Sequence, residues 1–528
     1  MTALTPAAQG KQPAVAARAA SLAEGPWLIT AAVMLATFME ILDATVVSVS
    51  LTHIAGSLSS TPNEATWALT SYLVANGIVI PISGWLANHF GRKNLLLVST
   101  AGFTLASLLC GIAPSMGLLV TFRVIQGACG GSLQPMSQAV MLEAFPPKQH
   151  GKAMAIWAMG AIVAPVLGPV LGGWLTDNFS WRWVFYINLP VGLVSVVMLK
   201  TFLHDPPYIR RSLARVDSWG LATLAIWVAA LQIMLDKGQE KDWFDSRFIL
   251  VLAVLFAVGL VAWVARELST PDPVAELRVF GQAPFAAGAL VMALVGFVMY
   301  GGQTTISLWL QTLLGYPSMQ AGEAMLAVGL GAAFAMPVAS LLTSRFDPRK
   351  VCACGVLGLG LSYYQLMGFN LRVGYWDLFW PQFLQGASIG LVFVPLAVVT
   401  MAFIPKEKMG NATSLFNMMR NIGGGVGISL VTTMLTRQGQ QHTNLLVANI
   451  TPVSPPATAL LAGMRNLFAG SGPGFADQQA YAALFGLVQR EATMVGLVRS
   501  FQFLGILSLI MVPMLALTKR PPRGQASL

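Results

Sequence analysis

Residues 160–173 read Gly160-Ala161-Ile162-Val163-Ala164-Pro165-Val166-Leu167-Gly168-Pro169-Val170-Leu171-Gly172-Gly173 and lie inside a long apolar stretch of the chain. The two prolines, Pro165 and Pro169, each remove a helical hydrogen bond. Four glycines leave part of the helix surface bare, so that a neighbouring helix can approach closely; they are Gly160, Gly168, Gly172 and Gly173. A helix that only anchors a protein needs neither feature, whereas a transporter that keeps one gate tight while the other opens needs both. The segment therefore predicts a helix at a moving interface of a transporter.

The composition places the rest of the chain in the membrane as well. Of 528 residues, 55% are hydrophobic and only 10% are charged, whereas soluble domains carry about 25% charged residues. The charged residues cluster between apolar runs of about 18 or more residues, each long enough to cross a bilayer as a helix. We therefore expect an all-α, multi-pass membrane protein rather than a soluble one.

The apolar runs predict fourteen transmembrane helices. Their expected ranges are 27–51, 66–87, 94–113, 116–138, 153–174, 183–202, 217–235, 248–265, 284–308, 321–343, 351–371, 376–402, 412–435 and 498–517. The first run is too long for the apolar part of a cleavable signal peptide, so it is expected to remain as the first span. The 62-residue connection 436–497, rich in Gly, Pro, Gln and Asn, is expected to be an outer loop.

The distribution of Lys and Arg predicts how the chain is oriented. With a cytosolic N-terminus, 20 of the 31 Lys and Arg residues fall on the inner side, 9 on the outer side and 2 within spans. Inner loops of membrane proteins are enriched in these residues. Both termini are therefore expected in the cytosol, and the net charge of +10 faces anionic lipid headgroups. No nucleic-acid partner is needed to explain it.

Several kinds of chemistry have no support in the sequence. The four cysteines lie within or at the edges of apolar runs, and their spacing implies neither a disulfide framework nor a metal site. The chain contains no G-x-x-x-x-G-K-[ST] loop for ATP and no H-E-x-x-H metalloprotease motif. We expect no enzymatic activity and no cofactor, with the proton-motive force as the energy source.

A set of short motifs adds a family resemblance to this interpretation. Besides residues 160–173 they are 42–45 (Leu-Asp-Ala-Thr), 84–93 (Gly-Trp-Leu-Ala-Asn-His-Phe-Gly-Arg-Lys), 123–127 (Arg-Val-Ile-Gln-Gly), 181–190 (Trp-Arg-Trp-Val-Phe-Tyr-Ile-Asn-Leu-Pro), 235–239 (Leu-Asp-Lys-Gly-Gln) and 242–244 (Asp-Trp-Phe). Together they resemble the fourteen-helix drug:proton antiporters of the major facilitator superfamily, from about Trp27 to Leu517. Residues 160–173 resemble the antiporter signature of the fifth helix in these exporters.

The resemblance implies the major facilitator fold, with two six-helix bundles and two inserted helices. The expected parts are a cytosolic tail at 1–26, an N-terminal bundle at 27–202, an inserted hairpin at 203–280, a C-terminal bundle at 281–517 and a cytosolic tail at 518–528. A weak internal repeat agrees with two related halves, because residues 340–350 echo residues 84–93 between two spans on the same side.

Charged side chains within the spans are the candidate coupling residues, because charges at bilayer depth are costly and usually functional. Glu40 and Asp43 are three residues apart and share one face of the first helix. Asp43 and Arg123 both lie roughly 10–12 Å below the outer surface by helix rise. In the fold that the chain resembles, the first and fourth helices both line the cavity of the N-terminal half, so the resemblance and the matched depth imply an ion pair, with Gln126 one turn along. Glu40 lies outside the family motif, as a second proton-binding group or a contact for cationic drugs. A static buried pair that only fixes helix register is the alternative.

Arg420 is the other charge within a span. Its candidate partners are backbone carbonyls, a lipid phosphate or an anionic substrate, and both a substrate or coupling role and a structural role remain open. Gly423, Gly424, Gly425 and Gly427 follow it, which predicts close helix packing there.

The 84–93 loop resembles the family's cytosolic gating motif, in which acidic and basic residues latch the two halves. Gly84, Gly91, Arg92 and Lys93 match the motif, whereas Asn88 and His89 replace its usual Asp and Arg. The acid-based part of the latch therefore has no support, and close packing at Gly84 is the remaining expectation. A plain cytosolic loop of positive charge is the alternative.

The function implied by the resemblance is proton-driven export of amphipathic toxic compounds through the inner membrane of a Gram-negative cell. The substrate is expected in a mostly apolar cavity between the halves, lined by aromatic and Met side chains. A periplasmic adaptor and an outer-membrane channel are the expected partners, as for pumps of tripartite multidrug systems. A proton-coupled uptake symporter and a transport-inactive receptor or scaffold are the alternatives. The antiporter segment argues against the first and the buried charges against the second.

Overall fold

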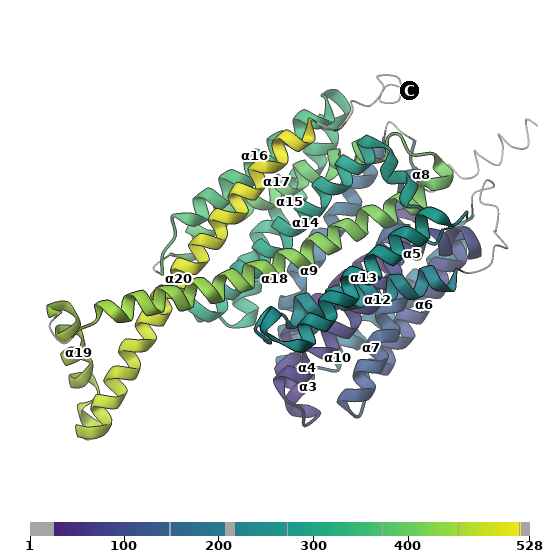
Figure 1. Ribbon diagram of the computed structural model, residues 1–528. Helices are drawn as coiled ribbons and strands as arrows, with labels where there is room; N and C mark the ends of the chain where they lie inside the picture. Colours follow the sequence, from purple (N-terminus) through teal and green to yellow (C-terminus); the bar gives the residue numbers. More distant parts are fainter. Residues whose placement is uncertain are drawn as a thin grey trace, which may run out of the picture.

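The computed structural model describes residues 26–146, 149–205, 217–271, 273–371, 373–451, 454–471, 473–516 and 518. These residues form long helices joined by short turns and loops, with no strand among them. Figure 1 shows the helices gathered into one bundle, from which a helical arm projects. The tails expected at 1–26 and 518–528 lie almost wholly outside the described residues.

The N-terminal bundle contains two helices that are interrupted where the sequence weakens them. Gly131 and Ser132 separate the two parts of the fourth span, and a short turn at Ile187 separates the two parts of the sixth. The elements are α2 (Pro26–Val49), α3 (Leu51–Ser57), α4 (Pro62–Ala65), α5 (Trp67–Phe90), α6 (Arg92–Gly111), α7 (Met116–Gly130), α8 (Leu133–Ala144), α9 (His150–Asn178), α10 (Trp183–Tyr186) and α11 (Asn188–Phe202). Despite Pro165 and Pro169, α9 continues through 29 residues without a break.

The second part of the chain adds a hairpin and the C-terminal bundle. The hairpin consists of α12 (Ser218–Lys237), η3 (Trp243–Asp245), α13 (Arg247–Ser269) and η4 (Leu277–Gly281). The C-terminal bundle consists of α14 (Ala283–Leu308), the π-helical turn η5 (Trp309–Leu313), α15 (Ser318–Arg345), α16 (Pro348–Met367), α17 (Tyr375–Met401), η6 (Lys406–Lys408), α18 (Met409–Asn449), α19 (Pro455–Leu467), η7 (Ala469–Ser471) and α20 (Pro473–Leu515).

The predicted all-α membrane architecture is confirmed. Twelve stretches within the described residues are helical, long and apolar enough to cross a membrane. Each of the fourteen predicted ranges falls on a helix or on two consecutive helices, but α16 and α18 are not among the twelve. The count of fourteen spans, the cytosolic termini and the division into domains stay predictions.

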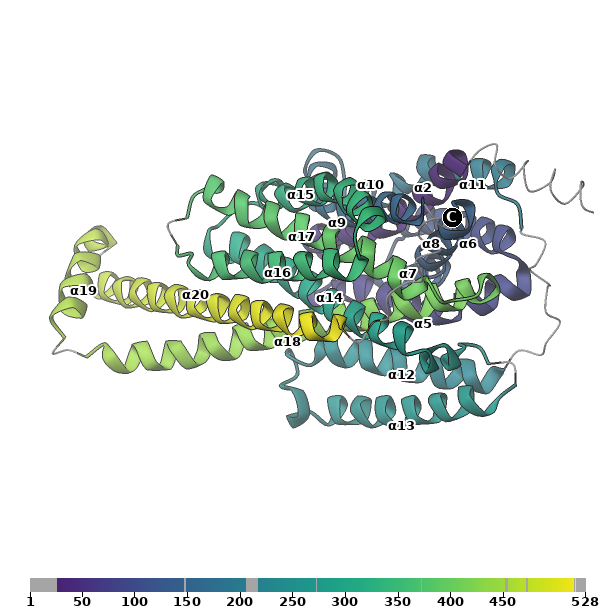
Figure 2. The same cartoon turned by 90° about the horizontal axis from the view of Figure 1, so that it is seen from above.

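The connection 436–497, which is expected on the outer side, is mostly helical, and its side of the membrane stays a prediction. α18 is 41 residues long and α20 is 43, so at about 1.5 Å per residue each is about twice as long as the hydrocarbon core is thick. α19 crosses between their ends, and Met464 of α19 packs on Ala480 and Leu484 of α20. Figures 1 and 2 show this arm of α18, α19 and α20 projecting beyond the other helices. The prolines of the segment lie only at 452–456 and 473, so the helices can continue up to those points.

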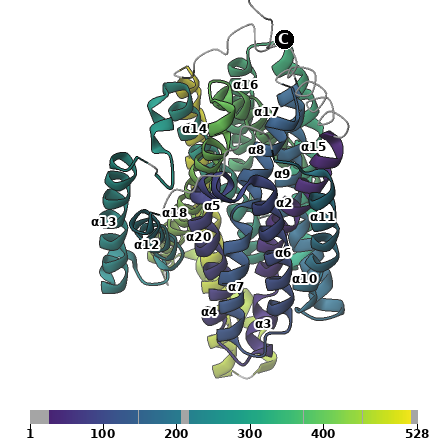
Figure 3. The same ribbon diagram turned by 90° about the vertical axis from the view of Figure 1, so that its right-hand side faces the viewer.

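The two bundles meet along two helix pairs. α9 packs on α15, and α5 packs on α18 at their inner ends. The inserted hairpin covers one side of the second pair: α12 contacts both α5 and α18, while α13 lies outermost (Figures 2 and 3). The hairpin is therefore in contact with both bundles rather than hanging free in the lipid.

Candidate functional site

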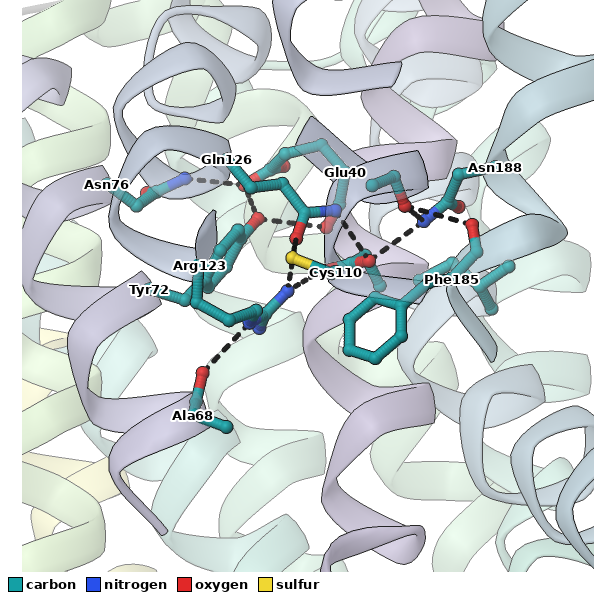
Figure 4. Close-up of polar contacts among 12 residues, drawn as sticks. Glu40, Ala68, Tyr72, Asn76, Cys110, Arg123, Gln126, Phe185 and Asn188 are labelled. Atoms are coloured by element: carbon teal, nitrogen blue, oxygen red, sulfur yellow. Dashed lines mark hydrogen bonds and ion pairs between the residues drawn. The ribbon is translucent and has the colours of Figure 1, made fainter. Parts of the chain in front are cut away.

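The first helix carries two buried carboxylates on one face. Glu40 and Asp43 of α2 are 3% and 1% exposed. Three residues correspond to about one helical turn, so the two side chains lie one above the other along the helix. Each carboxylate has its own set of polar partners, and the two sets adjoin in the interior of the N-terminal bundle (Figure 4).

Asp43 forms the ion pair with Arg123 of α7 that the sequence predicts. The two side chains are fully buried and in direct contact. The other carboxylate oxygen of Asp43, Oδ1, accepts hydrogen bonds from Nε2 of Gln126 at 3.0 Å and from Nδ2 of Asn188 at 2.8 Å. Asn188, at the start of α11, was not predicted. The carboxylate is thus held by three donors from two helices, α7 and α11, that pack around α2.

The guanidinium of Arg123 is held on several sides. Its Nε donates to the carbonyl oxygen of Ala68 at 2.8 Å, and one terminal nitrogen donates to Oε1 of Gln126 at 2.8 Å. Its Cζ lies 4.1 Å from the centre of the Tyr72 ring, a distance at which the ring face attracts a cation. A buried ion pair is tolerated when further hydrogen bonds satisfy the remaining polar atoms. This pair has most of them, but the second terminal nitrogen of Arg123 has no hydrogen-bond partner among the described residues.

Glu40 lies in a cradle of neutral side chains. Its Oε1 accepts from Nδ2 of Asn76 at 2.9 Å and from the hydroxyl of Tyr72 at 3.2 Å. Its Oε2 accepts from Nε2 of Gln134, in α8, at 2.7 Å. Tyr72 therefore contacts both acidic systems, because its hydroxyl faces Glu40 while its ring lies under Arg123.

Arg420 of α18 faces the Glu40 cradle from the other bundle. It is 3% exposed, and its terminal nitrogen donates to Oε1 of Gln134. Its Cζ lies 5.6 Å from the ring centre of Trp157 in α9. The partner is thus a side-chain amide, which is none of the three candidates that the sequence offered. The Nε of Arg420 has no hydrogen-bond partner among the described residues.

A narrow cavity between the bundles lies beside Arg420. Arg420 and Tyr300 line one end, next to Ala161, Ile162 and Met299. The same three residues continue into a larger space whose other lining residues are Pro165, Val166, Gln303, Ile306, Met325, Val328, Gln385 and Ile389. The centre of a water-sized sphere can occupy about 30 Å³ of this space, so a drug-sized molecule can enter only after the bundles separate.

The glycines of the antiporter segment lie where α9 crosses α2. A methyl group added at Gly168 would lie 2.0 Å from the hydroxyl oxygen of Thr45 and 3.1 Å from its backbone carbon. One added at Gly172 would lie 2.7 Å from the carbonyl oxygen of Val46. At Gly160 the obstacle is the flexible end of Met34, at 2.3 Å. The close packing predicted for this segment is therefore confirmed at Gly168 and Gly172.

The other side of the same segment faces the C-terminal bundle. Pro169 and Val170 lie against Gly322 of α15, where an added methyl group would approach them to 3.3 and 2.9 Å. Gly173 has more room, since its added methyl group would lie 3.9 Å from Met319. The α9 segment is thus placed between α2 of its own bundle and α15 of the other.

The gating loop places Gly84 in the tightest contact between α5 and α18. A methyl group on Gly84 would lie 2.7 Å from the backbone nitrogen and Cα of Asn411. One residue earlier, the hydroxyl of Ser83 lies 2.7 Å from that of Ser414. The close packing expected at Gly84 is confirmed, and its partner is the first turn of α18.

The remaining loop residues surround the turn between α5 and α6. Gly91 has a φ of +88°, a backbone conformation that favours glycine. Arg92 forms a buried ion pair with Glu143 of α8, and the amide of Lys93 donates to Asp205 at 2.8 Å. Asn88, which replaces the usual acid, is partly buried at the end of α5.

Sequence reasoning missed the acids that serve this gate. Glu143 and Asp205 hold the loop within the N-terminal bundle. Glu276, near the end of the inserted hairpin, pairs with Lys408 and accepts from Nδ2 of Asn411 at 3.4 Å. A carboxylate of the hairpin thus binds the helix packed on Gly84, and two other acids, distant in sequence, contact the loop itself.

Comparison with known proteins now adds to the geometry. The model of the Major Facilitator Superfamily matches residues 33–428. The chain belongs to this superfamily. Within it, the chain is 36% identical over 509 residues to the multidrug export protein EmrB of Haemophilus influenzae, covering 94% of this chain and 96% of that one. It is 35% identical over 495 residues to the fatty acid resistance protein FarB of Neisseria gonorrhoeae, covering 93% and 96%.

Solved structures confirm the fold of the superfamily. The crystal structure of the human organic anion transporter MFSD10 superposes with a TM-score of 0.58, covering 92% of this chain and 99% of that one, at 14% identity. At this identity the likeness concerns the fold alone. Together with the sequence relatives, it confirms that the chain is an EmrB-like multi-pass membrane protein of the superfamily, a family of transporters rather than enzymes.

Proposed function

We propose that the protein exports amphipathic toxic compounds from the cell in exchange for protons. EmrB and FarB, which this chain resembles over nearly its whole length, are named for multidrug export and fatty acid resistance. The observation that carries proton coupling is the fully buried Asp43–Arg123 pair. A carboxylate in this position can exist in two protonation states, and each state leaves a different net charge inside the N-terminal bundle.

Proton binding at Asp43 changes how the surrounding helices are held together. The ionised carboxylate collects Arg123, Gln126 and Asn188 from α7 and α11. A proton on it removes the charge that Arg123 pairs with and turns one oxygen from an acceptor into a donor. Arg123 then keeps its bonds to Gln126 and Ala68 but lies beside a neutral group, which favours a different packing of α2. Ligand or proton binding shifts a two-state equilibrium only through such differences.

The packing of α9 connects α2 to the second bundle. Gly168 and Gly172 hold α9 against α2, while Pro169 on the other side contacts α15. A displacement of α2 would therefore move α9, which is closely packed on both sides, and so change the interface between the bundles. In this conformation the bundles touch at Gly84 on one side of the cavity and at Gly322 on the other, as expected of a closed intermediate between two open forms.

The cavity favours compounds with an apolar body and a hydrogen-bond acceptor or negative group. Its lining is mainly aliphatic, with Gln303 and Gln385 as polar contacts. At the end next to Arg420, the buried Nε lacks a partner among the described residues, whereas both oxygens of Glu40 are occupied. An acceptor on the substrate would form a hydrogen bond with this donor. A buried donor without a partner otherwise costs free energy.

The arm of α18, α19 and α20 supports assembly into a tripartite system in the inner membrane of a Gram-negative cell. It projects beyond the bundle on the side expected to be periplasmic (Figure 1). Large apolar side chains are exposed on it, including Leu467 at 82%, Phe475 at 68% and Leu445 at 61%. Exposed apolar surface outside the membrane usually marks a protein contact, and the adaptor that links the pump to an outer-membrane channel is the partner proposed here.

Expression in a strain without its own efflux pumps tests the proposed function. Cells that carry the gene, with an adaptor and outer-membrane channel, should tolerate several-fold more of an anionic or neutral amphipathic compound than cells that carry Asp43→Asn. An uptake symporter would instead make cells more sensitive, and a receptor or scaffold would leave both strains alike. Either of these results across a broad compound panel would refute export.

A further inference from the structure

We infer that Gln134 is the positioning residue that passes the protonation state of Glu40 to Arg420, and so to the contact between the two bundles. This inference deepens the proposed function and rests on it. Gln134 lies in α8 of the N-terminal bundle and is 8% exposed. Its side-chain amide joins the carboxylate of Glu40 on one side to the guanidinium of Arg420 on the other.

The chemistry of its two neighbours fixes the orientation of this amide. An ionised carboxylate only accepts hydrogen bonds and a guanidinium only donates them. Nε2 must therefore face Glu40, at 2.7 Å from Oε2, and Oε1 must face Arg420. No other assignment of the amide atoms satisfies both neighbours.

A proton on Oε2 of Glu40 changes which atom of the Gln134 amide should face Glu40. The new O–H is a donor, and Gln134 accepts from it by presenting its own oxygen. The amide group then turns its NH₂ toward Arg420, where two donors face each other and the bond between the bundles is lost. Neutralising Glu40 also removes the negative charge that Arg420 faces, so both changes release Arg420 from α8.

The surroundings of Glu40 direct this effect to Gln134. Oε1 already accepts from Asn76 and Tyr72 on α5. The charged or titratable groups facing Glu40 are Tyr72 on α5 and Arg420 on α18. Asp43 and Arg123 lie near Tyr72, and Tyr300 of α14 lies next to Arg420. Of these, Arg420 belongs to the other bundle and contacts Gln134 directly.

The consequence is a switch at the substrate cavity. Arg420 lines that cavity and lies over Trp157. When Glu40 is ionised, the Gln134 bond holds Arg420 to the N-terminal bundle. When Glu40 is neutral, the whole guanidinium becomes available to the cavity and the bundles lose one bond between them. Gln134 thus makes the closure of the cavity between the bundles depend on proton binding by Glu40.

Distances between the bundles measured as a function of pH test this inference without any drug. Spin labels would be placed at the exposed Phe90 of α5 and at the exposed Phe346 just after α15 in full-length protein lacking its four native cysteines, in lipid nanodiscs. We expect the distance distribution of the wild type to shift between about pH 8 and about pH 5, where carboxyl groups can titrate. Gln134→Met, which cannot form either hydrogen bond, should lose this shift. Gln134→Leu should lose it as well, because it has neither a donor for Glu40 nor an acceptor for Arg420.

Gln138→Met is the matched control. Gln138 lies one turn further along α8, is buried, and bonds Asn417 of α18 at 2.6 Å without contacting a carboxylate. This variant should keep the pH-dependent shift of the wild type. A wild type that shows no shift, or Gln134 variants that shift as the wild type does, would overturn the inference. Because export is measured separately by drug tolerance, a pump that exports but lacks the shift leaves the proposed function intact.

Discussion

Gly84 of α5 lies directly against the backbone of Asn411 at the start of α18. A single added methyl group would approach the Asn411 nitrogen and Cα to 2.7 Å, so the two helices are as close as a glycine allows. The side-chain amide of the same asparagine donates a hydrogen bond to Glu276, near the end of the inserted hairpin. The expected cytosolic gate therefore has two parts, a tight backbone contact and a carboxylate that holds one of the contacting helices.

Glu276→Gln should loosen this gate. The substitution removes the charge that pairs with Lys408, and partly exposed ion pairs contribute about 0.2–1 kcal/mol. We expect Ser414→Cys, in a protein lacking its native cysteines, to react up to about fivefold faster with a water-soluble thiol reagent when Glu276 is replaced. Glu407→Gln is the control, because Glu407 is an exposed acid in the neighbouring turn. Equal rates in all three proteins would show that Glu276 does not hold the gate.

Gly168→Leu should disrupt coupling far more than a change at Gly173. Leucine at 168 would collide with Thr45 of α2, including its backbone, and overpacking of this kind costs about 1–3 kcal/mol. We expect the variant to leak protons or to remain in one conformation. Gly173→Ala, which meets nothing closer than 3.9 Å, should transport normally. Both variants are tested by measuring proton leak and drug transport in vesicles. Normal coupling in Gly168→Leu would show that the segment is an ordinary packed helix.

Removing the tip of the arm should abolish resistance in cells without unfolding the bundle. Residues 450–472, which include α19, would be replaced by a flexible linker of about ten residues. The bundle should keep its thermal stability because the tip packs mainly on α20 through Met464, Ala480 and Leu484. Transport by the purified protein should also persist. Leu467→Ser is a milder variant at an exposed apolar position and should reduce resistance in part. Full resistance without the tip would exclude it as the adaptor contact.

Part of this architecture follows directly from the sequence. The depth of Asp43 and Arg123 predicted their contact once the family resemblance had made the first and fourth helices neighbours, because a buried charge is costly unless it is paired. The glycines at 168 and 172 were enough to predict a close helix neighbour. The second inference needs only helix geometry, whereas the first also needs the resemblance.

Other parts depend on which helices become neighbours, and helix geometry does not provide that. Gln134 and Arg420 are 286 positions apart, and nothing in either helix identifies the other. The same holds for Glu276 at the gate. The long arm was missed for another reason: the polar residues after 435 look like a loop, although they lack the prolines that would end a helix before 452.

Drug accumulation in inverted membrane vesicles with an acidic interior tests the central claim most directly. The interior of such vesicles corresponds to the outer side, so an exporter driven by protons should concentrate a resisted compound inside and discharge the pH gradient as it does so. Asp43→Asn removes the charge that binds Arg123 and should bind the compound yet accumulate none. Arg123→Ala should behave in the same way. Accumulation by Asp43→Asn at the wild-type rate would contradict the account and move the proton site elsewhere, with Glu40 next in line.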